Sequence, residues 1–98
     1  NLIKNSLKKQ GHEKSKKTKE ILGCSVREFK KHLEDRFESW MTWENYGMFN
    51  ENYDTWQLDH ITPISSATTK EELVKLNHYS NFQPLRAIDN ILKSNKTN

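Results

Sequence analysis

The sequence predicts a small α+β fold in which two short strands are set among helices. Two observations lead to this prediction. An apolar stripe at helical spacing runs through the first half of the chain, and two short segments with strand character in the second half are separated by a helical one. The expected order is helices, strand, short helix, strand and helix, with no internal repeat.

The expected helix in the first half begins with a capping box. Ser25 supplies a hydroxyl at the N-cap and Glu28 a carboxylate three residues later. A helix is therefore predicted over residues 26–38, and its apolar stripe, read as core, consists of Val26, Phe29, Leu33 and Phe37. Before it, residues 19–22 are expected to form one helical turn that Gly23 ends.

The second half contains both strands. Residues 56–61 alternate as a strand does, and Pro63 ends the segment. A second capping box, Thr69 with Glu72, opens a short helix. The second strand is predicted over residues 82–85, where Pro84 limits pairing to one side. A helix over residues 86–94 follows, with Ile88, Ile91 and Leu92 expected to face inward.

Composition predicts one domain of 98 residues with a small core, because only 33% of residues are hydrophobic and the mean hydropathy is −1.02. Aromatic residues must therefore form much of that core. They crowd residues 40–56, where packing is the expected role and stacking on nucleobases the alternative. This aromatic layer contains Trp40, Trp43, Tyr46, Phe49, Tyr53 and Trp56.

Charge is unevenly distributed. Residues 1–36 hold eleven Lys/Arg and five Asp/Glu, whereas residues 37–98 hold five Lys/Arg and eight Asp/Glu. A basic arm or helix over residues 1–20, joined to a domain over residues 21–98, favours a polyanionic partner, although a solvated Lys-rich tail has the same composition. Leu2, Ile3 and Leu7 give the arm a short apolar face, and residues 10–17 read as a loop.

Several classes of protein are excluded by what the chain lacks. A single cysteine, Cys24, allows neither an intramolecular disulfide nor a Cys-based zinc knuckle. No apolar run approaches the roughly 18 residues of a membrane span, and no signal peptide is visible. We therefore expect no membrane partner and an intracellular, cytoplasmic location. The chain begins with Asn rather than Met, as a piece of a longer protein would.

The residues that carry chemistry are Asp59, His60, Asn81 and Asn90. Phosphodiester hydrolysis needs a base for the attacking water and a hard cation to neutralise developing charge. An imidazole suits the first need, and a carboxylate with an amide oxygen suits the second. One difficulty is geometric: neighbouring strand residues point to opposite faces. Asp59 and His60 can share a site only if the strand bends or the phosphate lies along its edge.

Three segments resemble the HNH endonuclease family, whose members have a ββα-metal fold. They are Leu58-Asp-His-Ile-Thr-Pro63, Asn81-Phe-Gln-Pro-Leu85, and Asp89-Asn90 with Lys93. They are similar to the family's D-H-x-x-P, N-L-Q-P-L and N-x-x-K segments, and residues 22–47 resemble its phage-type and virus-type members. The resemblance covers about residues 20–96, and implies a two-stranded antiparallel sheet followed by a metal-binding C-terminal helix.

The resemblance implies a role for each residue. His60 is the expected general base, and Asp59 and Asn90 are the expected ligands of one divalent cation, most readily Mg²⁺ with Mn²⁺ as substitute. Asn81 is expected to pin the loop between the strands and so to orient His60. Many family members carry zinc-binding Cys pairs, but residues 86–89 here are Arg-Ala-Ile-Asp, so no structural zinc is implied.

The expected DNA contacts are basic side chains outside this set: Lys8, Lys9, Lys16, Lys17, Lys30, Arg86 and Lys93. For Arg86 a surface salt bridge is the alternative, and for Lys93 a solvated helix face. His78 is read as a packed or capping residue, with a ligand role as the alternative. His12 and His32 are read as surface groups.

The leading hypothesis is a metal-dependent endonuclease that nicks double-stranded DNA as a monomer, or makes double-strand breaks as a dimer. If phage-encoded, it would act in the host cytoplasm. A non-catalytic DNA-binding module of a larger protein is the second hypothesis. The third is a small structural protein in which the Asp-His-Asn pattern arose by chance.

Overall fold

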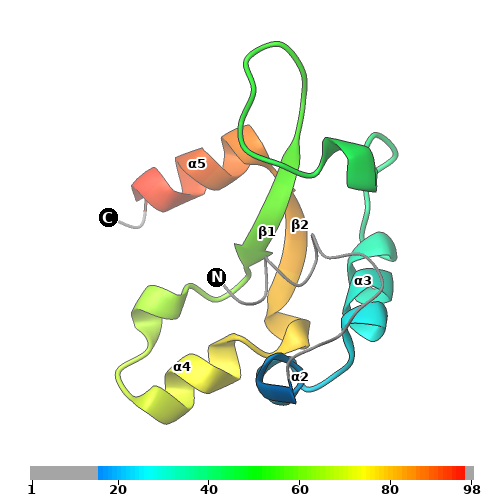
Figure 1. Ribbon diagram of the computed structural model, residues 1–98. Coiled ribbons are helices and arrows are strands. Elements are labelled where there is room, and N and C mark those ends of the chain that lie inside the picture. The colour runs from blue at the N-terminus through cyan, green and yellow to red at the C-terminus, as the bar shows by residue number, and fades with distance from the viewer. Residues whose placement is uncertain (1–15, 97–98) are drawn as a thin grey trace.

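The computed structural model describes residues 16–96 (Figure 1). The basic arm or helix predicted over residues 1–20 lies mostly outside this range, as do its apolar residues Leu2, Ile3 and Leu7 and most of the loop predicted over residues 10–17. The helices and strands, in chain order, are α2 (Lys16–Leu22), α3 (Val26–Glu34), η1 (Trp43–Asn45), β1 (Trp56–His60), η2 (Ile64–Ser66), α4 (Lys70–Leu76), η3 (Tyr79–Asn81), β2 (Phe82–Arg86) and α5 (Ala87–Lys96).

Strands β1 and β2 form a two-stranded antiparallel sheet, so the predicted α+β class is confirmed. The register is regular from Trp56 opposite Arg86 to His60 opposite Phe82. Figure 1 shows α4, which belongs to the connection between the strands, at the lower left, beyond the C-terminal end of β1. The described residues contain no third strand of this sheet, and the start of β1 also forms an isolated parallel bridge from Trp56 to Tyr46.

The two faces of the sheet have different partners. Trp56 and Leu58 join the buried core with Phe29 and Leu33 of α3. Gln57 and Asp59, which alternate with them along β1, point the other way and contact α5. The sheet therefore lies between α3 and α5, and only the α3 face is apolar.

Helix α5 overturns one prediction about the core. Ile88, Ile91 and Leu92 do not face inward, because 37%, 40% and 50% of their surface is exposed. The face of α5 that meets the sheet carries Ala87, Asn90 and Lys93, which lie three residues apart and so on one side of the helix. Polar side chains of β1 oppose it, which explains why the large apolar residues of α5 turn outward.

The aromatic layer confirms the packing prediction for its centre. Trp56 is fully buried and stacks on Tyr46 with ring centroids 4.5 Å apart, while Trp43 meets Trp56 edge-on at 5.3 Å. Burial raises the pKa of the Tyr46 hydroxyl. Phe49 and Tyr53 are exposed and do not belong to the layer.

Three details of the helices differ from the sequence prediction. Helix α2 begins at Lys16, within the segment predicted as a loop, and not at residue 19. Helix α3 stops at Glu34, not residue 38, because its last turn tightens into a hydrogen bond from the Phe37 amide to the Glu34 carbonyl. The capping box of α4 is divided: the Thr69 hydroxyl accepts from the Glu72 amide, but the Glu72 carboxylate accepts from Thr68. The backbone and side-chain hydrogen bonds from Thr68 lower the pKa of Glu72. The box of Ser25 and Glu28 is complete, as predicted.

Gly23 ends α2 as predicted, with a φ of +79°. A Cβ at this position would lie 2.7 Å from Nε2 of His78. We expect Gly23→Ala to lower the free energy of unfolding by about 1–2 kcal/mol from backbone strain alone. Gly47→Ala is the matched control, since its Cβ meets nothing within 4 Å. Urea denaturation of both variants checks this, and equal stabilities would contradict it.

Within residues 16–96, no helix is long and apolar enough to cross a membrane.

Candidate functional site

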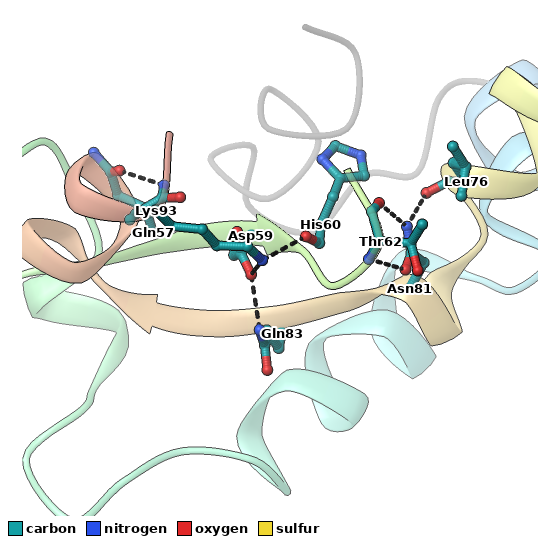
Figure 2. Close-up of polar contacts among 9 residues, drawn as sticks. Gln57, Asp59, His60, Thr62, Leu76, Asn81, Gln83 and Lys93 are labelled. Atoms are coloured by element: carbon teal, nitrogen blue, oxygen red, sulfur yellow. Dashed lines mark hydrogen bonds and ion pairs between the residues drawn. The ribbon is translucent and has the colours of Figure 1, made fainter. Parts of the chain in front are cut away.

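Strand β1 delivers Asp59 and His60 to its C-terminal end, where they point in opposite directions (Figure 2). The pairing stays regular up to His60, so no bend turns both side chains to one face. Lys93 links the two residues, because its ammonium donates to the Asp59 carboxylate at 2.7 Å and to the main-chain carbonyl of His60 at 2.9 Å. A phosphate shared by the two side chains must therefore lie along the strand edge.

Asp59 is a buried carboxylate with one oxygen committed and one open. The residue is only 6% exposed. Its Oδ2 accepts from Nε2 of Gln83 and from Nζ of Lys93, both at 2.7 Å. Its Oδ1 receives no hydrogen bond from the described residues. Because the hydrogen bonds to Oδ2 hold the carboxylate in place, Oδ1 is a good candidate for binding a cation.

Asn90 lies on the same face of α5 as Lys93 and contacts β1 two residues before Asp59. Its Nδ2 donates to Oε1 of Gln57 at 2.8 Å, and this bond holds the amide against the strand. Its Oδ1 then has no hydrogen-bond partner among the described residues. Gln57–Asn90 and Asp59–Lys93 thus form successive polar rungs between strand and helix.

The chemistry of these donors fits one hard divalent cation. The open oxygens belong to a carboxylate and an amide, which Mg²⁺ accepts as ligands while keeping several waters. No group of three or more His, Cys, Asp or Glu side chains in the described part of the chain could hold a metal ion. Asp59 and Asn90 offer two protein oxygens, and Mg²⁺ accepts such a small number of protein ligands.

His60 is held on two sides. Its Nε2 lies 2.9 Å from Oδ1 of Asn77, at the C-terminal end of α4. Its ring packs on that of Phe82, with the centroids 4.5 Å apart and the planes at 44°. Phe82 is itself buried in the core, so the imidazole rests on a fixed surface. Its Nδ1 makes no hydrogen bond to the residues that the structure describes.

Asn81 makes the side-chain to backbone hydrogen bonds expected of it. Its Oδ1 accepts from the Thr62 amide at 2.9 Å, and its Nδ2 donates to the carbonyls of Thr62 at 3.0 Å and Leu76 at 2.7 Å. The Asn81 amide therefore connects the backbone just after β1 to the end of α4 (Figure 2).

The basic side chains expected to contact DNA have varied surroundings. Lys30 lies over the Trp43 ring at 5.6 Å. Arg86 stacks over Trp40 at 4.6 Å and pairs with Asp54, which is the salt-bridge alternative. Lys93 is not on a solvated helix face but points into the site. Lys8 and Lys9 lie outside the described residues; Lys16 and Lys17 begin α2, and their side chains are not described.

The histidines outside the site divide between confirmation and correction. His78 is a capping residue as predicted, since Nδ1 accepts from the Ser80 amide. The reading of His32 as a surface group is wrong. Its Nε2 lies 3.0 Å from the Phe82 carbonyl and its ring contacts Tyr79, because α3 packs directly against β2. His12 lies outside the described residues.

Three residues at the site were given no role from the sequence. Gln83 lies in the motif next to Asn81, and Gln57 stands two residues before Asp59, so strand alternation could have placed both on the Asp59 face. Asn77 gives no such signal. Its contact with His60 spans 17 residues and depends on where α4 ends.

Comparison with known proteins finds relatives in one virus. No family model and no solved structure matches the chain. Two uncharacterized proteins of Acanthamoeba polyphaga mimivirus are similar to it. One is 34% identical over 84 residues, which covers 84% of this chain and 34% of the relative. The other is 35% identical over 95 residues, covering 84% and 39%. The chain thus spans about a third of the length of these curated relatives.

Proposed function

We propose that the protein is a metal-dependent DNA endonuclease of the HNH type, which hydrolyses one phosphodiester bond per site. The observation that carries the proposal is the pair of open oxygens, on Asp59 and Asn90, beside a strand end that also presents the fixed imidazole of His60. A chance pattern would not require a buried carboxylate to lie at this position. A pure DNA-binding module would have no use for it either.

The proposed division of labour follows from the contacts. Asp59 and Asn90 would hold the cation, which would supply neutralisation of charge on the phosphate and the leaving oxygen. His60 would accept a proton from water, the resulting hydroxide would attack phosphorus, and the bond to the 3′ oxygen would break, with this oxygen taking a proton from solvent water. Lys93 and Gln83 keep the Asp59 carboxylate in position, and Asn81 fixes the backbone just beyond His60.

DNA would be held mainly through its backbone. The basic residues of segment 1–36 are suited to phosphates, which predicts salt-sensitive affinity with little reading of base sequence. One site acts on one strand, so a monomer nicks and a double-strand break needs two sites.

The proposal predicts cleavage that depends on divalent metal. Purified protein with Mg²⁺ or Mn²⁺ is expected to convert supercoiled plasmid to the relaxed form, and EDTA is expected to abolish the reaction. The His60→Ala protein, purified identically, controls for contaminating nuclease. Full activity in EDTA would contradict the mechanism. Tight DNA binding with neither cleavage nor Mn²⁺ binding would favour the non-catalytic module.

A further inference from the structure

The amide of Asn77 has one possible orientation. Its Nδ2 lies 3.0 Å from the carbonyl oxygen of Leu73, so the other end of the amide faces His60. Rotating the amide by half a turn would place Oδ1 against the Leu73 carbonyl, and two acceptors would then face one another. The atom that meets Nε2 of His60 is therefore an oxygen.

An oxygen beside Nε2 determines where the neutral imidazole carries its proton. A neutral imidazole has one donor and one acceptor nitrogen, and Oδ1 of Asn77 can only accept. The proton must lie on Nε2, so the lone pair lies on Nδ1. Nδ1 is also the ring nitrogen without a hydrogen-bond partner among the described residues.

We propose that Asn77 is a positioning residue, which holds the His60 imidazole in the Nε2–H form so that Nδ1 receives the proton of the attacking water. This deepens the proposed endonuclease function and rests on it. Two contacts hold the imidazole in place: Phe82 packs against its face, and Asn77 meets its Nε2.

The position of Asn77 depends in turn on Asn81. Asn81 donates to the carbonyl of Leu76, the residue before Asn77, and also to the carbonyl of Thr62. The end of α4 is thereby fixed relative to the end of β1. Asn81 would thus orient His60 indirectly. It positions the end of α4, and the Asn77 amide at that end contacts the imidazole.

The decisive variant is Asn77→Leu, which keeps the branched shape and removes the acceptor. In the wild type we expect nitrogen NMR of neutral His60 to show the proton on Nε2, with slow exchange of this proton against solvent. In Asn77→Leu the exchange becomes fast. Asn77→Asp, which retains an acceptor oxygen, is expected to restore slow exchange. A wild-type imidazole protonated on Nδ1, or equally fast exchange in wild type and Asn77→Leu, would overturn the proposal.

Kinetics give a second, separate readout. Asn77→Leu is expected to lower kcat by about 10²-fold, the effect of misplacing a reacting group by about 1 Å, while KM for DNA and the affinity for Mn²⁺ stay unchanged. Asn45→Leu is the matched control, since within residues 16–96 the Asn45 amide bonds only to the backbone of Thr42 and Trp40. It is expected to reduce stability and leave kcat intact.

The two proposals can fail separately. If the wild type does not cut DNA, the endonuclease proposal fails, yet the NMR exchange rates still decide whether Asn77 holds His60. If the wild type cuts and Asn77→Leu cuts equally fast, the positioning role is wrong and the endonuclease proposal stands.

Discussion

Replacing His60 with alanine is expected to slow plasmid nicking by about 10²- to 10⁴-fold, which is the contribution of a general base. Mn²⁺ affinity should hardly change, because Asp59 points toward α5, which carries Asn90, whereas the imidazole faces Phe82 and Asn77. Nicking rates and Mn²⁺ calorimetry measured on the same preparations check both halves of this expectation.

The control for this variant is His78→Ala. His78 is another partly buried histidine near the end of α4, but its hydrogen bonds go to Ser80. Its loss should reduce stability through the cap of η3 and leave the nicking rate close to that of the wild type. If both alanine variants nick at the wild-type rate, His60 is not the base.

The second large effect is expected at Asp59. Asp59→Asn removes the charged oxygen donor and should eliminate measurable Mn²⁺ binding. A bound metal ion supplies several kcal/mol of transition-state stabilisation, so we expect nicking to fall by more than about 10²-fold. The protein should remain folded, because the Lys93 side chain is 33% exposed and can turn toward water when its partner is lost.

Asp89→Asn provides the same change of charge elsewhere on the protein. Asp89 is an exposed carboxylate in the first turn of α5, one residue before Asn90. Its replacement should affect neither Mn²⁺ binding nor cleavage. Wild-type Mn²⁺ affinity in Asp59→Asn, or its loss in both variants, would show that the cation binds somewhere else.

Local patterns predicted the elements of the fold well. The capping residues Ser25 and Thr69 mark the starts of α3 and α4, and the two strands end within a residue of their predicted limits. These features depend on neighbours in sequence, which a single chain reveals.

Features that depend on distant partners were not predictable in this way. The apolar residues of α5, such as Ile88, appeared suited to a core, but the helix docks on a polar strand face. His32 has basic neighbours in sequence and was predicted to be a surface group, but β2 lies beside α3 and contacts its side chain. Asn77 reaches His60 only because the connection between the strands folds back to the strand end. Each case required knowledge of which elements meet.

The ion pair between Lys93 and Asp59 affects the order of folding and cation binding. The chain supplies its own counter-charge to the buried carboxylate, so it can reach its mature shape before any cation arrives. Small zinc domains differ, since their folding waits for the ion. If the proposed cation binds at Asp59, its binding would be a later and separate step, governed by the free cation concentration around the folded protein. A newly made molecule at low cation concentration would then be folded but inactive.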